Sequence, residues 1–172
     1  MAKFENGVVN FAVYENATQF LGMAEVTLPE ISQITEEMKG AGISGSYNAP
    51  YIGQLEAMTL TLNFNTVTRA AMSITSPEQH KIDMRVAQQA FDNAVGKYKI
   101  TNVKHVAIVT PTKTNLGKIA PASPAEASGE YSVSYFATFI DGAKILEIDV
   151  LNFIYMVNGI DYLADVRKAL GK

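Results

Sequence analysis

The chain has 172 residues, a length that fits one domain over residues 1–172 with a sizeable core, and its net charge is −3. A hydrophobic content of 48% excludes a disordered chain, and the absence of cysteine excludes a disulfide framework and thiolate chemistry. No basic block marks a nucleic-acid binder, and Met1–Asn6 leads into no apolar run, so we expect neither a signal peptide nor a membrane span.

The first quarter of the chain predicts strands separated by turn residues. Apolar and β-prone runs favour strands at Val8–Tyr14, Phe20–Leu28 and Ile31–Met38, and Pro29 ends the second of them. Residues 40–53 then carry glycines at 40, 42, 45 and 53 together with Pro50. This composition predicts a long mobile loop, and loops of that length in a compact domain are usually functional.

Regular alternation of apolar and polar residues is clearest at Ala57–Asn65. Met58, Leu60, Leu62 and Phe64 share one face, and Thr59, Thr61, Asn63 and Asn65 share the other. This is the pattern of an antiparallel strand with one face buried and one face in water. Residues 67–73 favour a helical turn.

Further strands are predicted at His80–Val86, Tyr98–Thr110, Tyr131–Ile140 and Ile145–Val150, with an exposed excursion at residues 111–129. Asp141-Gly142 is a strong hairpin signal between the last two strands. We therefore expect a mainly β fold, an antiparallel β-sandwich or half-barrel of about eight strands with one or two short α-helices.

The C-terminal residues predict a short amphipathic helix. Its apolar residues recur at helical spacing, and Asp161 near its start and Arg167 near its end suit the helix dipole. The apolar stripe could bind a partner, but we expect most of it to cover the chain's own sheet. The residues of the stripe are Ile160, Leu163, Val166 and Leu170.

No group of residues predicts catalysis or metal binding. His80 and His105 have no ligand partners at metal-binding spacing. The glycines at 40, 42 and 45 match a Gly-x-Gly-x-x-Gly spacing, but no parallel βαβ unit surrounds them. Glu147 and Asp149 share a strand face, where a solvated surface is the ordinary explanation. We expect no enzymatic activity and no cofactor.

Two segments resemble the major tail tube proteins of contractile-tailed bacteriophages. The stronger match runs from Leu146-Glu147-Ile148-Asp149-Val150 through Asn158-Gly159 to Leu163–Gly171. The weaker match combines Met23–Pro29, the glycine-rich residues 40–45 and Gly53–Met58. The resemblance extends to the tubes of contractile bacteriocins and type VI secretion systems.

The resemblance implies a structural virion protein whose hexameric rings stack into the inner tail tube, the conduit for genome ejection. Strands from all subunits would complete a β-barrel around the channel. The implied partners are further copies of the chain, the tail sheath protein, baseplate or initiator and terminator proteins, the tape measure protein and transiting DNA. Assembly would take place in the host cytoplasm.

Two sets of residues are candidates for contacts in such a tube. For contacts between rings we expect the glycine-rich segment, with Gly40, Gly42, Ile43, Gly45, Tyr47 and Tyr51. The channel lining should be polar and poor in Lys and Arg, so that phosphates do not bind. Two alternatives for this lining remain open: the polar face Thr59, Thr61, Asn63 and Asn65, or the strand around Asp83, Gln88 and Gln89.

Two other functions remain as alternatives. The inner tube of a contractile bacteriocin would share the fold but carry no DNA. A small monomeric β-barrel that binds a ligand would instead need a closed barrel with an apolar interior. A hydrolytic enzyme is disfavoured because no nucleophile–base pair is evident.

Overall fold

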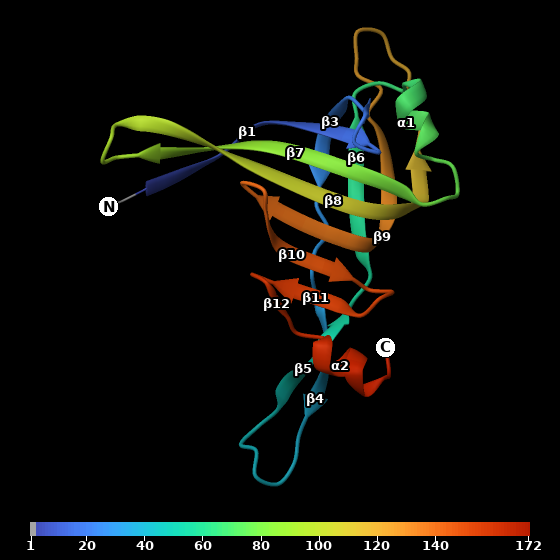
Figure 1. Cartoon of the computed structure of the whole chain (residues 1–172). Coiled ribbons are helices and arrows are strands. Elements are labelled where there is room, and N and C mark those ends of the chain that lie inside the picture. The colour runs from blue at the N-terminus through green and yellow to red at the C-terminus, as the bar shows by residue number, and fades with distance from the viewer. Residues whose placement is uncertain (1–2) are drawn as a thin grey trace.

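The computed structural model describes residues 3–172, apart from the side chains of Met23 and Ala24. Strands dominate and the two helices are short (Figure 1). The elements in chain order are β1 (Lys3–Glu15), β2 (Gln19–Phe20), β3 (Met23–Thr27), β4 (Gln33–Met38), β5 (Tyr47–Leu55), β6 (Met58–Phe64), α1 (Arg69–Ser73), β7 (His80–Asp92), β8 (Lys97–Asn115), β9 (Ala127–Ile140), β10 (Ala143–Asp149), β11 (Ile154–Val157), β12 (Ile160–Asp161) and α2 (Ala164–Ala169).

The strands of the body form two layers that share β8 and β9. The wide layer has the order β12-β11-β10-β9-β8-β7-β1-β2, and every pairing in it is antiparallel. The narrow layer has the order β3-β6-β9-β8 and uses residues 127–133 of β9 and 110–115 of β8. In Figure 1 the strands of the narrow layer cross behind the wide layer at a steep angle.

The hydrophobic core lies between these two layers. From the narrow layer, β6 contributes Met58, Leu60, Leu62 and Phe64, all buried, as its alternation predicts. From the wide layer, Ile82 and Met84 of β7 meet them. The opposite face of each layer is therefore left for solvent or for other proteins.

Several predicted elements are confirmed. The fold is mainly β and antiparallel with two short helices, and Val67–Ser73 contains α1, whose N-cap Thr68 accepts a hydrogen bond from Ala71 N at 3.1 Å. Asp141 and Gly142 form the two-residue turn between β9 and β10, both with positive φ. The strands are longer or more divided than expected, and the structure has twelve of them in residues 3–172.

The prediction of a long loop over residues 40–53 is wrong in its second half. Tyr47–Leu55 forms β5, which pairs with β4 in a separate two-stranded sheet, so only residues 39–46 are loop. The glycines weakened the local strand signal, but the backbone hydrogen bonds to β4 stabilise the extended conformation. We call residues 33–55 the foot hairpin; it projects at the bottom of Figure 1.

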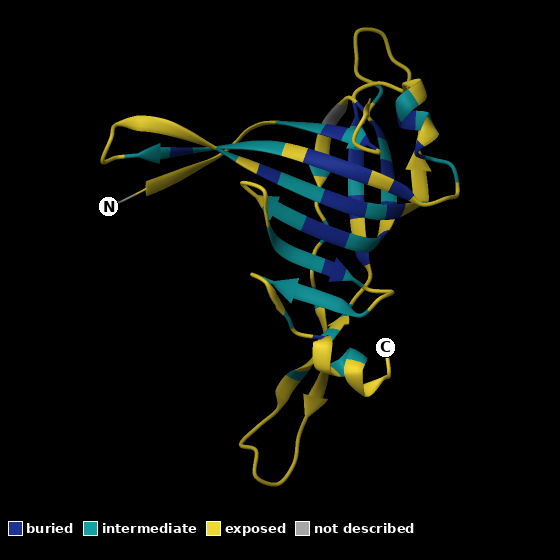
Figure 2. Cartoon of the chain, viewed as in Figure 1, coloured by how far each residue is buried: buried dark blue, intermediate teal, exposed yellow. Residues whose placement is uncertain are grey.

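The expected role of the C-terminal apolar stripe is mostly wrong. Leu163 is only 3% exposed, but Ile160 is 59% and Leu170 55% exposed (Figure 2). The reason is that α2 packs at the base of the foot hairpin instead of over the sheet. Gly53 makes this contact possible, because a Cβ at this position would lie 2.4 Å from Leu163 Cδ2, and its φ is +67°.

Shortening a core side chain of β6 should destabilise the subunit far more than shortening its solvent-facing neighbour. We expect Leu62→Ala to lower the free energy of unfolding by about 2–5 kcal/mol, because it leaves a cavity between the layers. Thr61→Ala, which changes the opposite face, should cost less than about 1 kcal/mol. Urea unfolding of the two variants measures both values, and equal losses would contradict this placement of the core.

Candidate assembly surfaces

The narrow layer ends on both sides in a strand with an unpaired edge. On one side, β3 pairs with β6 alone. On the other, the segment Thr110–Asn115 of β8 pairs with β9 alone, because pairing of β8 with β7 stops at Val109. Over residues 3–172 no further strand covers either edge. Such rows of free N–H and C=O groups readily pair with another chain.

The wide layer, by contrast, ends in two very short strands. The two-residue strands β2 and β12 lie at its ends. Short edge strands limit pairing with other chains, but β2 covers only Tyr14 and Glu15 of β1, so in the described part of the chain residues 3–12 of β1 have no strand on their outer side. Since β2 and β12 do not pair with each other, the sheet stays open within one subunit. This contradicts the alternative of a closed monomeric barrel that binds a ligand.

The solvent-facing side of the narrow layer is polar and almost free of unpaired positive charge. We call it the polar face. Its one lysine, Lys113, lies 3.4 Å from Glu130 in an ion pair. The register places its residues in adjacent rows: Glu25 and Thr27 of β3, Thr59, Thr61 and Asn63 of β6, Ser128, Glu130 and Ser132 of β9, and Thr110, Lys113 and Asn115 of β8. Asn65, the fourth predicted residue, is exposed just beyond β6.

The solvent-facing side of the wide layer is richer in positive charge. Alternation along β7, β8 and β10 places Lys81, Arg85, Lys104 and Lys144 on this side, opposite the core. Three of these cations contact neighbours: the Arg85 guanidinium stacks 4.5 Å above the Tyr14 ring, Lys104 Nζ lies 3.5 Å from Asp83, and Lys144 Nζ lies 2.9 Å from Glu147. The two sides of the body therefore differ in charge.

Glu147, one of the two carboxylates noted from the sequence, forms an ion pair with Lys144. Burial acts to raise the pKa of Glu147, but the Lys144 ammonium and the Tyr135 hydroxyl, which donates at 2.7 Å, outweigh it and hold that pKa below its usual value. Burial and the same carboxylate raise the pKa of Tyr135. These shifts follow from packing on a sheet face.

The two predicted channel linings lie in different layers, and the residues of the second do not share one face, since Asp83 and Gln88 lie on opposite sides of β7. Asp83 is only 1% exposed, so the prediction that it lines a channel is wrong for this subunit. The strand period placed Asp83 away from Ile82 and Met84, but its neighbours on the sheet cover it. Gln88 lies further along β7, half-buried, and faces a groove beside Val8. Of the two predicted linings, the polar face is the one that forms a continuous surface of exposed and half-buried side chains.

The foot hairpin carries the residues predicted for contacts between rings. Gly40, Gly42 and Gly45 lie in the loop at its tip, so their spacing occurs in a β-hairpin and not in a phosphate-binding turn. Ile43, Tyr47 and Tyr51 are exposed. Glu36 accepts a hydrogen bond from the Tyr51 hydroxyl at 2.6 Å, which raises the pKa of Tyr51.

Two further projections expose apolar side chains; sequence reasoning missed the first, whereas the second lies within the exposed excursion predicted at residues 111–129. The first, which we call the arm, consists of residues 3–10 of β1 and residues 88–101, which are the end of β7, the start of β8 and the turn between them (left in Figure 1). The second is the loop of residues 116–126 at the top. The adjacent valines at 8 and 9 could have indicated a strand with two apolar faces. The exposed apolar residues of these parts are Phe4, Val8, Val9, Val95, Tyr98, Ile100, Leu116 and Ile119.

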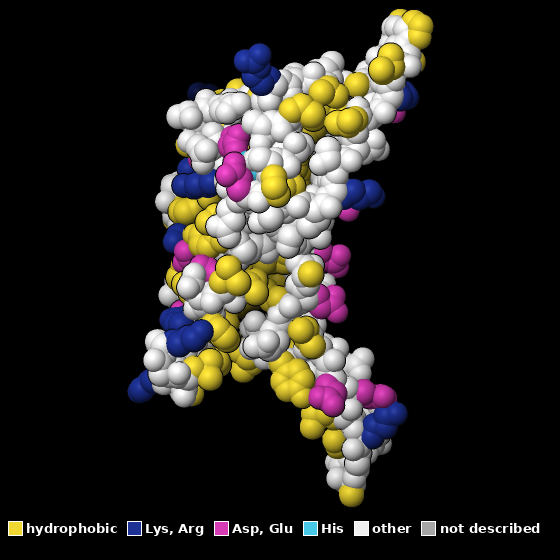
Figure 3. Space-filling model, turned by 90° about the vertical axis from the view of Figure 1, so that its right-hand side faces the viewer, with side chains coloured by type: hydrophobic (Ala, Val, Ile, Leu, Met, Phe, Trp, Pro, Cys, Tyr) yellow, Lys and Arg dark blue, Asp and Glu magenta, His cyan; other side chains and the backbone are white. Residues whose placement is uncertain are grey.

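These projections make the subunit unlike an ordinary monomer. Figure 3 shows hydrophobic side chains at the tip of the upper loop and along one side of the lower projection, whose other side is charged. Large apolar areas of this kind mark sites of protein–protein contact. The foot hairpin and the upper loop point in opposite directions along the body, whereas the arm points sideways.

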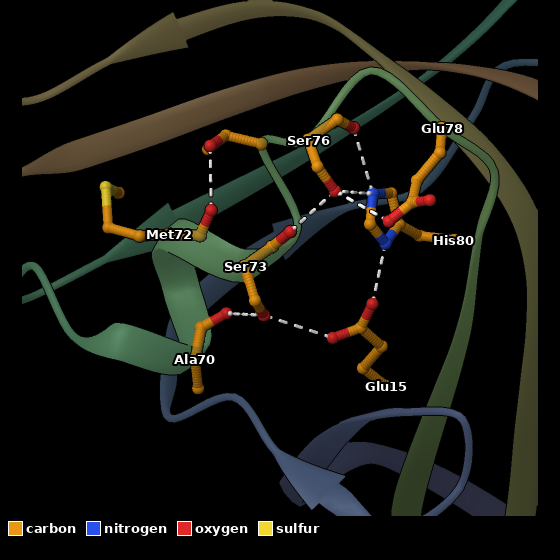
Figure 4. Close-up of polar contacts among 8 residues, drawn as sticks. Glu15, Ala70, Met72, Ser73, Ser76, Glu78 and His80 are labelled. Atoms are coloured by element: carbon orange, nitrogen blue, oxygen red, sulfur yellow. Dashed lines mark hydrogen bonds and ion pairs between the residues drawn. The ribbon is translucent and has the colours of Figure 1, made fainter.

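A buried polar cluster fixes the segment after α1 to the end of β1 (Figure 4). His80 Nδ1 lies 2.6 Å from Glu15 Oε1, and His80 Nε2 lies 3.1 Å from the carbonyl oxygen of Ser76. The Ser73 hydroxyl donates to Glu15 Oε2 at 3.2 Å. Since both ring nitrogens face acceptors, the protonated imidazole satisfies the site best.

The environment of His80 raises its pKa. Burial acts to lower the pKa of His80, but the hydrogen bonds to Glu15 and Ser76 and the charge of Glu15 together outweigh it. Within residues 3–172 no group of three or more His, Cys, Asp or Glu residues could hold a metal ion. No helix in the described part of the chain is long and apolar enough to cross a membrane.

Comparison with known proteins gives concordant results. The family model of the phage tail tube protein FII matches residues 5–171. The tail tube protein of Escherichia phage P2 is 26% identical over 166 residues, which cover 92% of this chain and 93% of that protein.

Two solved structures share the fold. A chain of the PVC sheath/tube terminator, from an extracellular contractile injection system in its extended state, aligns with a TM-score of 0.54 at 17% identity and covers 77% of this chain and 94% of that one. A chain of the PVC sheath–tube complex aligns with a TM-score of 0.52 at 18% identity and covers 76% and 88%.

The cluster around His80 should make stability depend on pH. Because the pKa of His80 is raised on folding, its contribution is complete below the unfolded value of about 6.5 and is lost as the pH rises through the folded pKa. The difference in unfolding free energy between the wild type and His80→Gln, measured with urea from about pH 5.5 to 8.5, should therefore shrink as the pH rises.

His105→Gln is the matched control with the opposite sign. Burial lowers the pKa of His105, so its contribution is lost as the pH falls. A His80→Gln difference that stayed constant across the pH range would contradict the assignment of the protonated form.

Proposed function

The chain belongs to the phage tail tube protein FII family, and from this premise we propose that its copies close into hexameric rings that stack into the inner tube of a contractile tail. It is a structural tail tube protein and a component of the tail particle. The observation that carries the proposal is the pair of unpaired edges at the two ends of one antiparallel layer.

Ring closure would pair the edge of β3 in one subunit with the β8 edge of the next. Strand directions in the narrow layer alternate, so β3 and β8 run antiparallel to each other, and the new pair would continue the antiparallel order. Because the two edges differ, the contact is head-to-tail and closes by rotation. A closed barrel leaves no free edge.

Stacking would use the two projections that point along the body. The foot hairpin would contact the next ring on one side, and the loop of residues 116–126 lies at the opposite end of the subunit (Figure 1). Residues 29–57 include four glutamates and one lysine, so the foot hairpin and its base are acidic. In a free subunit the loop of residues 39–46 makes few contacts beyond its own hairpin. Contact with a neighbouring ring would order this loop at a cost in conformational entropy.

The polar face would line the channel. It lies on the layer whose edges pair between subunits, and it consists mainly of hydroxyl and amide side chains with Glu25, Glu130 and the neutralised Lys113. Unpaired lysines and arginines would bind phosphates and slow a passing nucleic acid. The more basic side of the wide layer would then face outward.

The outward side would meet the sheath in an assembled tail. The two similar structures are chains of a sheath/tube terminator and of a sheath–tube complex. We propose that this chain likewise contacts a sheath protein and a terminator protein, together with a baseplate or initiator protein. Inside the channel we propose the tape measure protein and DNA as non-specific occupants. Assembly in the host cytoplasm and the lack of enzymatic activity belong to the same proposal.

A contractile bacteriocin or an injection system would use the same tube without a genome. The family model and the phage P2 relative favour a phage tail, since both are tail tube proteins of phages. The likeness to the injection system chains concerns the fold.

Shortening the foot hairpin should block stacking but leave the subunit folded. Replacing Glu37–Asn48 with Asn-Gly joins Glu36 to Ala49, which already face each other in register, through a favourable two-residue turn. We expect this variant to form single rings or free subunits and no tubes by negative-stain microscopy, with wild-type circular dichroism. Tubes of normal length would refute the role of the hairpin.

Added positive charge on the polar face should slow the passage of DNA. We expect particles with Thr61→Lys and Asn63→Lys to release their genome several-fold more slowly at low salt and to recover as salt rises, because lysines bind phosphates by releasing counterions. Asn102→Lys, which adds one positive charge on the exposed side of the wide layer, is the matched control for each single substitution. Equal ejection rates in all particles would exclude the polar face as the lining.

A further inference from the structure

An apolar groove lies beneath the root of the arm, where the two layers separate. Its volume is about 180 Å³. One wall comes from β1, β7 and β8 of the wide layer, and the other comes from β3 and the residue that follows it. The lining residues are Val8, Phe11, Val26, Leu28, Met84, Val86, Gln88 and His105.

The groove is an unfilled continuation of the hydrophobic core. Met84 belongs to the core, and Phe11 and Val26 pack against it. Towards the mouth the same surface becomes exposed, with Val8 58% and Leu28 41% exposed. Exposed aliphatic side chains that continue a core indicate that a further layer of chain completes the packing.

The back of the groove is uncharged at neutral pH. The His105 ring stacks on Phe136, with ring centroids 5.7 Å apart, and its Nδ1 lies 2.9 Å from the hydroxyl oxygen of Thr138. Burial lowers the pKa of His105, which favours the neutral imidazole. An apolar segment of chain therefore fits the groove better than a charged one.

The groove lies beside an unpaired backbone edge. Val26 belongs to β3, whose outer edge is free, and Leu28 follows directly. A strand that adds to β3 would place every second side chain on the core side, over the groove. The arm, which roots at the same place and points sideways, would then overhang the added strand (Figure 1).

We propose that the groove beneath the arm receives a second copy of this chain, namely the β8 segment Thr110–Asn115 of the neighbouring subunit, with the arm closing over it. This inference rests on the proposed ring. The arm covers the added strand. Val8 on the lower side of the arm packs on this strand, so that apolar burial adds to the backbone hydrogen bonds at the β3 edge.

The chemistry of the incoming segment fits this seat. On the core side of the narrow layer, Pro111 is opposite the buried Tyr131, and Thr114 is opposite Gly129. These side chains have no formal charge, whereas Lys113, paired with Glu130, points to the polar face. The segment therefore presents uncharged side chains to the groove and keeps its charge on the channel side.

Neighbouring valines on the arm provide the test. Val8 and Val9 are 58% and 56% exposed, but only Val8 lines the groove. Both substitutions to lysine are at exposed positions, so both variants should fold. We expect Val8→Lys to raise the protein concentration needed for assembly at least tenfold, and Val9→Lys to change it by less than about twofold. Light scattering and negative-stain microscopy measure the onset.

Cysteine cross-linking tests the position of the neighbour directly. The chain has no cysteine of its own, so an introduced pair reports one contact. Leu28→Cys, combined in turn with a single cysteine at each position of 110–115, should give disulfide-linked ladders in assembled protein at one or two neighbouring positions, because a disulfide needs Cα atoms within about 7 Å. Val9→Cys with the same set should give none.

The outcomes separate this inference from the proposed function. If wild-type protein forms neither rings nor tubes, the proposed function is wrong and the inference falls with it. If the wild type assembles but Val8→Lys and Val9→Lys behave alike, whether both assemble or both fail, the groove is not the seat. Absence of ladders at all positions of 110–115 in assembled protein would also overturn it.

Discussion

Unsatisfied backbone hydrogen bonds at the two edges of the narrow layer are the constraint on which the rest of this structure depends. A strand with free N–H and C=O groups must be covered, shortened or paired. The wide layer leaves residues 3–12 of β1 open beyond the short strand β2, and the narrow layer is open at both ends, along β3 and along residues 110–115 of β8. In the proposed ring, pairing with identical neighbours would satisfy both edges of the narrow layer with a single contact, and that contact would also close the ring.

The distribution of charge follows from the same arrangement. In the proposed ring, the narrow layer would form the inner surface and the wide layer the outer surface. The polar face keeps its lysine in an ion pair with Glu130, whereas the exposed side of the wide layer holds Lys81, Arg85, Lys104 and Lys144. A chain with a net charge of only −3 can thus present a nearly neutral surface to a polyanion without giving up basic residues elsewhere.

Local patterns predicted the parts of the fold that depend on neighbouring residues. The alternation of Met58–Phe64 gave both the core and the polar face, and Asp141-Gly142 gave the turn between β9 and β10. Local patterns do not predict pairing between distant segments. The sequence predicts a loop where β5 lies, because the hydrogen bonds between β5 and β4 leave no local signal. The contact between Glu15 and His80 spans 65 positions and has no periodicity.

The candidate surfaces show the same limit. A period of two residues shows that Asp83 faces away from Ile82, but it does not show that surrounding side chains bury it. The sequence also offered the stretches around Thr61 and around Gln88 as equal candidates for a lining, because layer membership is a tertiary property. The sequence did not predict the arm, because a strand that extends beyond the core has the same sequence pattern as a longer strand within the core.

The sharing of β8 and β9 between the layers has a mechanical consequence. Each of these strands runs unbroken from the narrow layer to the wide layer, so the two layers are joined by covalent backbone and not only by side-chain packing. Pulling the layers apart would require bending or breaking the chain itself. A tube built from such units should carry compressive and shear loads through its full thickness.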